Sequence, residues 1–185
     1  MQDFASRLGD LETLVKFGLG SLAIWLLTQI ASFLGKLLAQ RNARIALVRA
    51  LFAEVQFNAA DLSGFLEESQ FDALLLKLAE PNYVPHITDA RHTQIYGVNI
   101  GHIHHIPDHI VKDVVRFYGG LEKIRTQIEG VRLPSYAPLS EAGKATLLAR
   151  LRTECRDTER LGLVIMKNMQ LRYPRLHLGH APGAP

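Results

Sequence analysis

The chain has 185 residues and a net charge of +3, and nearly half of its residues are hydrophobic. Its single cysteine excludes an internal disulfide framework, and the mildly basic balance does not by itself require a nucleic-acid partner. A mean hydropathy of +0.05 lies between the values of soluble and integral membrane proteins, as one membrane span joined to a soluble domain would give.

The first element is a stretch of nineteen residues without charge, Phe17–Gly35, between Lys16 and Lys36. A helix of this length spans roughly 28 Å, close to the ~30 Å hydrocarbon core of a bilayer. We predict a transmembrane helix with its basic flank over residues 14–40. A cleaved signal peptide is not expected, because acidic residues precede the stretch and basic residues follow it. A buried or interfacial helix, as in a soluble oligomer that buries residues 17–35, is the alternative.

Charge differs between the two sides of this stretch. Residues 1–12 hold three acids and one arginine, whereas only basic charges occur from residue 36 to residue 53. Because basic residues concentrate on the cytoplasmic side of a span, we predict a single-pass protein of the inner cell membrane. Residues 1–13 would be a short extracytoplasmic N-terminus, and the C-terminal domain would be cytoplasmic. The candidate contacts with anionic lipid headgroups are Lys36, Arg41, Arg44 and Arg49.

Two patterns indicate helix–helix interfaces. Small residues recur every four positions along the span and its exit, which lets membrane helices approach closely. Beyond residue 40, apolar residues alternate at spacings of three and four, as in a heptad repeat. This seam predicts a long helix to about residue 66 that packs against a helix of the same chain or of another copy. The candidate interface residues are Ala31, Gly35, Ala39, Ile45, Val48, Phe52, Val55 and Leu62. A homo-oligomer or another membrane protein is the expected partner, beside the bilayer itself.

Further helices are expected within a domain of residues 41–173. Apolar periodicity and proline positions place them at about 70–80, 89–103, 108–129 and 141–172. Pro107 and Ser140 suit the beginnings of the last two helices. Gly119 and Gly120 indicate either close approach of a neighbouring helix or a kink. The tail, residues 174–185, is rich in Gly, Pro and His and is predicted to be disordered.

The predicted fold class is therefore all-α. An N-terminal single transmembrane helix continues into a cytoplasmic antiparallel helical bundle of about four helices.

A histidine cluster is the first candidate site. His102, His105 and His109 could approach one metal ion, for which Zn²⁺ is the expected identity, and no other cofactor is expected. The preferred interpretation is a helix corner whose histidines face water or bond to the backbone, in which case no cofactor is expected. Asp89 and His92 with Tyr96 form a second pattern, because three- and four-residue spacings would place them on one helix face.

No residues match a nucleophile, P-loop or metalloprotease motif, so we predict a non-enzymatic membrane-anchored scaffold or accessory subunit of a larger membrane complex. The alternatives are a metal-binding protein or enzyme centred on the His102–His109 cluster, and the soluble helical oligomer. Arg152, Arg156 and Arg160 form a basic helix face, but solvation or pairing with acids is its preferred explanation. Nucleic acid is therefore not the expected partner.

Overall fold

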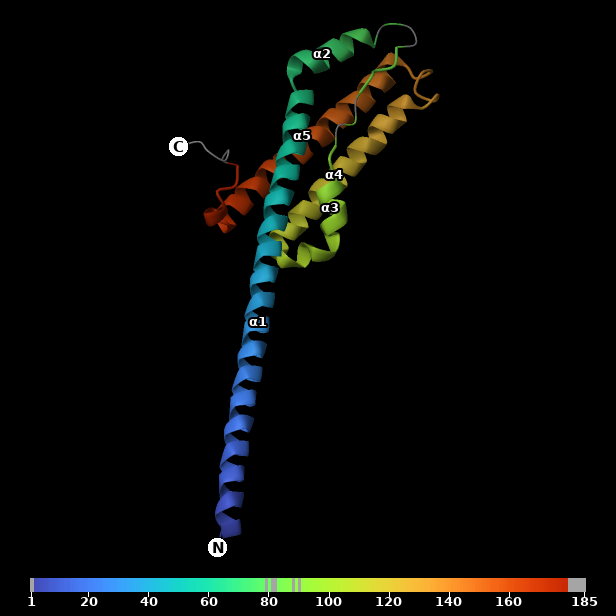
Figure 1. Cartoon of the computed structure of the whole chain (residues 1–185). Coiled ribbons are helices and arrows are strands. Elements are labelled where there is room, and N and C mark those ends of the chain that lie inside the picture. The colour runs from blue at the N-terminus through green and yellow to red at the C-terminus, as the bar shows by residue number, and fades with distance from the viewer. Residues whose placement is uncertain (1, 79, 81–82, 88, 90, 180–185) are drawn as a thin grey trace. The chain divides into compact units, whose positions relative to one another are not determined.

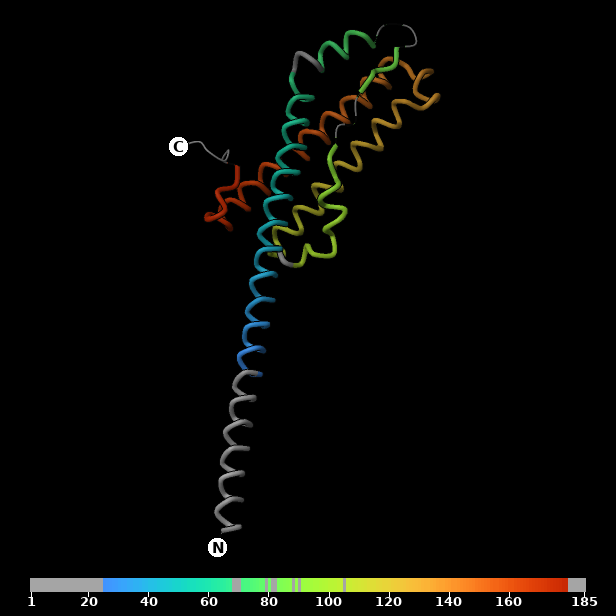
Figure 2. The backbone as a smooth tube through the Cα atoms, in the orientation of Figure 1, coloured from blue at the N-terminus to red at the C-terminus, as the bar shows by residue number. Residues whose placement is uncertain are grey.

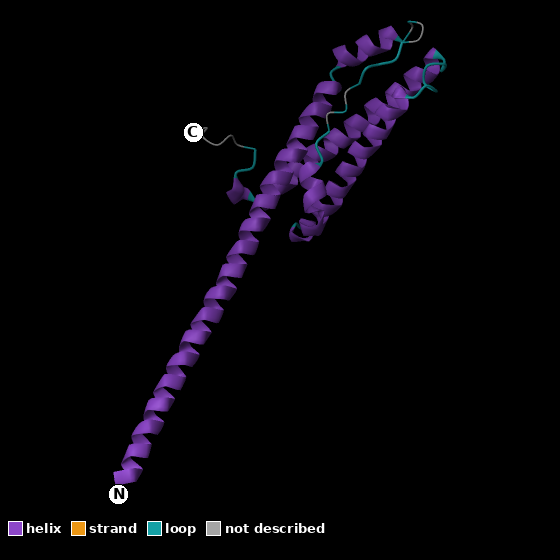
Figure 3. Cartoon of the chain, turned by 45° about the vertical axis from the view of Figure 1, so that its right-hand side comes forward, coloured by secondary structure: helices purple, strands orange, loops and turns teal. Residues whose placement is uncertain are grey.

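The computed structural model describes residues 2–78, 80, 83–87, 89 and 91–179, and it describes side chains from residue 25 onward except those of residues 68–70 and 105. Figure 2 draws the remaining parts in grey. The described residues form α-helices and short 3₁₀-helices without a strand, so the predicted all-α fold is confirmed (Figure 1; Figure 3). The chain divides into two units, residues 1–44 and residues 45–185.

The first unit contains the amino-terminal part of helix α1, which begins at Gln2 and ends at Phe65. Every side chain described from residue 25 to residue 43 is exposed. Within the described part of the chain, no helix carries an apolar stretch long enough to cross a membrane. The first eight residues of the predicted span, 17–24, lie outside the described side chains. The transmembrane helix therefore stays a prediction.

The second unit is a helical bundle around one core. Its elements after α1 are α2 (Glu68–Lys77), α3 (Gln94–Asn99), the 3₁₀-helix η1 (Ile100–His105), α4 (Asp108–Arg132), α5 (Glu141–Arg172) and the 3₁₀-helix η2 (Pro174–Leu176). Helices α4 and α5 form an antiparallel hairpin, and the carboxy-terminal part of α1 contributes to the same core (Figure 1). The described bundle thus has three long helices, with α2 and α3 as short additions, where the sequence predicted about four.

The seam of α1 supplies one side of this core. Val48, Phe52, Val55 and Leu62 are buried together with the apolar stripes of α4 and α5. These stripes include Ile110, Val114, Phe117, Leu121, Leu148, Leu151, Ile165 and Met169. The heptad spacing in this region therefore serves packing within the chain's own bundle, which was one of the two possibilities that the sequence left open.

Local signals placed the two hairpin helices well. Ser140 is the N-cap of α5, and its Oγ accepts a hydrogen bond from the Gly143 backbone N–H at 3.2 Å. The side chain thereby satisfies one of the donors that a helix start leaves unpaired. Pro107 precedes the first residue of α4, where a missing N–H removes no helical bond. The predicted starts of both helices are confirmed.

The paired glycines of α4 differ in their surroundings. A Cβ built on Gly120 would lie 2.4 Å from the Thr158 Oγ1 on α5, whereas one built on Gly119 would meet nothing within 4 Å. Gly162 on α5 is similarly crowded, since its Cβ would lie 2.8 Å from Phe117 Cε2. The prediction of close helix approach therefore holds for Gly120. Gly119 lies on the exposed side of an unbroken helix.

The predicted helix at 89–103 is wrong over its first part. Residues 91–93 are not helical, and only α3, followed by η1, forms between residues 94 and 105. No side chain of the segment caps the start of α3, and the backbone N–H groups of Ile95 and Tyr96 bind the Glu54 carboxylate instead. Residue 88, which directly precedes the predicted helix, lies outside the described residues. Asp89, His92 and Tyr96 consequently do not share a helix face.

The beginning of the predicted tail packs on the bundle. Leu178 is buried in the core, and its carbonyl accepts a hydrogen bond from Gln170 Nε2 at 3.1 Å. His177 and Gly179 have positive φ angles of 48° and 84°, which turn the chain back after η2. Residues 180–185 lie outside the described part of the chain.

Candidate functional site

Two polar residues of α1, Glu54 and Asn58, face the bundle interior. They lie one turn apart, and both are buried. The Asn58 side chain donates to the His92 carbonyl at 2.7 Å and accepts from the His92 backbone N–H at 2.7 Å. The Asn58 side chain thus bonds both backbone groups of His92, in the segment between α2 and α3, and replaces the partners that a neighbouring backbone would supply. This fixes the segment against α1.

Glu54 fixes the start of α3 in a related way. Its carboxylate accepts hydrogen bonds from the backbone N–H groups of Ile95 at 2.8 Å and Tyr96 at 2.9 Å. These donors belong to the first turn of α3, where a negative charge is also favoured by the helix dipole. A carboxylate from another helix therefore replaces the local cap that the sequence of this segment lacks. We call Glu54 and Asn58, with the backbone they bind, the α1 clamp.

A tyrosine of α4 completes the clamp. The Tyr118 hydroxyl donates to Glu54 Oε2 at 2.5 Å, and its ring stacks on Tyr96 with 3.9 Å between ring centroids. Burial, reinforced by the hydrogen bond to Glu54, raises the pKa of Tyr118 above its ordinary value. The phenol therefore stays protonated and continues to donate. Three donors from two elements thus satisfy the buried carboxylate.

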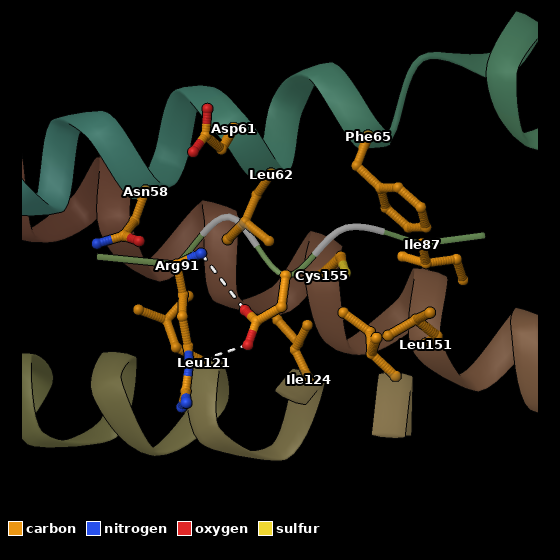
Figure 4. Close-up of a pocket in the computed structure, with 12 residues that line it drawn as sticks. Asn58, Asp61, Leu62, Phe65, Ile87, Arg91, Leu121, Ile124, Leu151 and Cys155 are labelled. Atoms are coloured by element: carbon orange, nitrogen blue, oxygen red, sulfur yellow. Dashed lines mark hydrogen bonds and ion pairs between the residues drawn. The ribbon is translucent and has the colours of Figure 1, made fainter. Parts of the chain in front are cut away.

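A small cavity lies beside the clamp, between α1, the segment before α3, α4 and α5 (Figure 4). Its volume is about 60 Å³. Leu62 and Phe65 of α1 line it together with Leu121, Ile124 and Ile128 of α4 and Leu151 and Cys155 of α5. Sites for small molecules usually measure about 300–1,000 Å³, so this cavity has room for a few water molecules rather than for an ordinary substrate.

Charged residues lie at the edge of this cavity. Arg91 Nε pairs with Asp89 Oδ2 at 3.2 Å (Figure 4). The Arg91 guanidinium also binds Glu122 on α4. Hydrogen bonds hold the pKa of Glu122 below its ordinary value, with the larger contribution from Arg125 and a smaller one from Arg91. The Arg132 guanidinium donates to the Ile87 carbonyl at 2.6 Å. These contacts tie the segment before α3 to helix α4.

Cys155 lies at the wall of the cavity and is buried. Burial, with a smaller contribution from Glu154, raises the pKa of its thiol to about 12. The thiol is therefore protonated at neutral pH, whereas nucleophilic cysteines are ionised. This environment fits the packing role that the apolar stripe of α5 indicates.

The histidines of the predicted metal site fall on two elements. His102 and His105 belong to η1, and His109 lies in the first turn of α4. His102 and His109 are exposed, and the side chain of His105 lies outside the described ones. The described residues contain no group of three side chains arranged to hold a metal ion. The neighbouring His104 places its Nδ1 2.9 Å from the Gly101 carbonyl oxygen. Zinc binding stays a prediction.

Some of the predicted lipid contacts and interface residues are exposed, and others are buried. Lys36, Arg41 and Arg49 are exposed, and Arg44 is half-buried. Ala31, Gly35 and Ala39 are exposed in the first unit, while Ile45 is half-buried and Val48, Phe52, Val55 and Leu62 are in the core of the second. Among the predicted interface residues, the small-residue stripe Ala31, Gly35 and Ala39 is therefore the exposed part.

Sequence reasoning missed Glu54 and Asn58. A signal was present, because both lie directly before apolar seam residues, Val55 and Ala59, and are spaced one turn apart. Polar residues at core-facing positions are buried only with partners. Their backbone partners are far away in sequence, 34 residues from Asn58 and 41 and 42 residues from Glu54.

Comparisons with protein-family models, with curated proteins and with solved structures gave no match.

Proposed function

We propose that this protein is a membrane-anchored helical scaffold or accessory subunit of a larger membrane complex, with the amino-terminal part of α1 as its anchor. The observation that carries the proposal is a run of large apolar side chains that the chain itself leaves uncovered. They are Trp25, Leu26, Leu27, Ile30, Phe33, Leu34, Leu37 and Leu38, each between 45% and 66% exposed.

Water is a poor environment for such a segment. Large exposed apolar patches mark contacts with proteins or membranes, and a helix without tertiary packing is only marginally stable in water. A bilayer removes both difficulties, because it covers apolar side chains and favours internally bonded backbone. The stretch Phe17–Gly35 has the length and the lack of charge that a span requires.

Two further features support the details of the proposal. The exposed Lys36 and Arg41 follow the stretch, which favours a cytoplasmic location for the bundle. Ala31, Gly35 and Ala39 follow one side of the same helix, where a second membrane helix could approach closely. The second copy or other subunit that docks there would join the bundle to a membrane complex.

Extraction of membranes with alkaline carbonate tests the anchor. The wild-type protein should stay in the membrane pellet. The double variant Leu27→Lys, Ile30→Lys should move to the supernatant, because a lysine near the centre of a span costs about 2.5–3.5 kcal/mol. The control is Leu76→Lys, since Leu76 is an apolar side chain of α2 that is 80% exposed but lies outside the stretch.

Two results would overturn the proposal. Release of the wild-type protein into the supernatant would favour the soluble helical oligomer. Equal retention of the wild-type protein and the double variant would show that the stretch is not the part that holds the protein to the membrane. The Leu76→Lys control should stay in the pellet, so that release of the double variant is not a general effect of added charge.

A further inference from the structure

A larger cavity lies at the closed end of the α4–α5 hairpin, away from the α1 clamp. We call it the hairpin cavity. The end of α4, the connection to α5 and the first turns of α5 surround about 430 Å³, a volume within the roughly 300–1,000 Å³ of small-molecule sites. Its apolar walls are Val131, Leu133, Leu139, Leu147 and Leu151. Its polar lining residues are Gln127, Ser135, Tyr136 and Arg150.

Two polar groups of this lining are buried without hydrogen bonds. Within the described part of the chain, neither the Tyr136 hydroxyl nor Gln127 Oε1 has a partner. Tyr136 is only 1% exposed. The Lys144 Nζ lies over its ring, 5.5 Å from the centroid, and so contacts the ring face. A buried polar group without a partner destabilises the fold unless something supplies that partner.

The described lining of the hairpin cavity carries positive charge but no negative charge. Arg150, on the exposed side of α5, lines the cavity, and no acidic residue is among the described residues that do so. Burial raises the pKa of Tyr136, so its hydroxyl stays protonated as a donor at neutral pH. A cationic group, a phenol donor and leucine walls together match a molecule with an anionic head and an apolar body.

We propose that the hairpin cavity binds a small amphipathic carboxylate. The apolar body lies among the leucine side chains, the Arg150 guanidinium pairs with the carboxylate, and the Tyr136 hydroxyl donates to one of its oxygens. The Gln127 Nε2 group can donate a further hydrogen bond to the carboxylate, whereas its Oε1, an acceptor, gains no partner from this ligand. The site belongs to the second unit and does not depend on the proposed anchor.

Isothermal titration calorimetry of the full-length protein in a mild nonionic detergent tests this site with 4-phenylbutyrate as the probe. Heats from titration into detergent alone are subtracted. The wild-type protein should bind 4-phenylbutyrate, whereas 4-phenylbutylamine, which has the same apolar body and the opposite charge, should not bind. Arg150→Gln should weaken the affinity at least about tenfold, as expected for loss of a hydrogen bond to a charged group.

Two more variants and one control complete the test. Leu147→Trp should weaken binding, because the larger side chain takes up part of the cavity that the apolar body would occupy. Tyr136→Phe should weaken binding about tenfold but keep or raise the melting temperature without ligand, because it removes a buried hydroxyl that has no partner. Arg156→Gln is the control, since Arg156 is an exposed arginine of α5 outside the cavity lining, and it should bind as the wild-type protein does.

The proposal fails if the wild-type protein gives no heat beyond that of the detergent, or if the amine binds as well as the carboxylate. It also fails if Arg150→Gln or Tyr136→Phe binds with wild-type affinity, because the carboxylate would then not use those groups.

Discussion

Glu54 illustrates how a single buried charge is stabilised in this bundle. Isolated carboxylates are expensive to bury, and they persist in cores only with several good donors. Here two backbone N–H groups and the Tyr118 hydroxyl fill that role at 2.5–2.9 Å. The same contacts position α3, which has no capping side chain of its own. The residue therefore contributes to local structure and to tertiary packing at once.

Replacing this carboxylate by its amide should be costly. In Glu54→Gln the neutral side chain keeps one acceptor oxygen for three donors, so buried donors lose their partner. We expect the free energy of unfolding to fall by about 3 kcal/mol, in line with lost hydrogen bonds to a charged group. Chemical denaturation followed by circular dichroism measures the change.

The matched control is Glu129→Gln. Glu129 is an exposed residue of α4 that pairs with Arg125, and exposed ion pairs contribute only about 0–1 kcal/mol. A double-mutant cycle of Glu54→Gln with Tyr118→Phe should show a coupling energy, because the two side chains share a hydrogen bond. Equal small effects of Glu54→Gln and Glu129→Gln would mean that the clamp does not hold α3.

At the scale of elements, the α4–α5 interface provides a paired test of one substitution. Gly120→Ala should destabilise the fold by about 1–3 kcal/mol, because its Cβ would overlap the Thr158 side chain on the facing helix. Gly119→Ala should stabilise the fold by up to about 1 kcal/mol, because alanine favours the helix and its Cβ meets nothing. Thermal or chemical unfolding of the two variants measures the difference.

We expect stability changes of opposite sign at these two adjacent positions, a loss for Gly120→Ala and a gain for Gly119→Ala. Should both alanine variants lose stability equally, helix packing at Gly120 would not explain the glycine pair. The double variant Gly120→Ala, Thr158→Ala offers a check, because removing the threonine Oγ1 and Cγ2 relieves the overlap and should recover part of the lost stability.

The elements differ in how far the sequence predicts them. Helices α4 and α5 carry their own signals, a proline or serine at the start and an apolar stripe of helical period, so their starts are predicted correctly. Helix α3 begins later than predicted because its cap is Glu54, far away in the chain. The candidate cavities also arise from side chains of separate elements, which no local pattern combines.

The small-residue stripe of α1 gives a second prediction at this scale. The double variant Gly35→Leu, Ala39→Leu should weaken self-association or docking to another membrane subunit, because bulky side chains keep helices apart. A Cβ on Gly35 meets nothing within 4 Å, so the folded chain itself should tolerate the change. Gel filtration or cross-linking in mild detergent measures the size of the assembly.

Gln40→Leu is the control for this stripe. Residue 40 lies about 100° around the helix from residue 39, so it adds a similar apolar side chain beside the stripe. The control should keep the wild-type size. If the double variant keeps the wild-type size as well, the stripe is not an interface.

At the scale of the whole molecule, the two units differ in what stabilises them. The second unit buries its apolar stripes in one core, which the chain builds for itself. The first unit contains no buried side chain among residues 25–43. The described side chains of this unit therefore add no tertiary packing to its helix. This difference is the physical reason for proposing that the first unit lies in a bilayer.

The direction of insertion can be predicted from the same assignment. Because basic residues follow the span, the amino terminus should lie outside the cytoplasm and the bundle inside it. Two single-cysteine additions report on the two sides, Ser6→Cys before the span and Thr153→Cys on the exposed surface of α5. The native Cys155 is buried and its pKa is raised to about 12, so it should contribute little labelling.

A membrane-impermeant maleimide, applied to spheroplasts, measures the exposure of each site. The Ser6→Cys protein should be labelled in intact spheroplasts, and the Thr153→Cys protein only after the membrane is permeabilised. The unsubstituted protein sets the background. Labelling of Thr153→Cys in intact spheroplasts with protection of Ser6→Cys would reverse the orientation. Protection of both sites until permeabilisation would show that α1 does not cross the membrane, and the first unit would then lie at the membrane surface or against another protein chain.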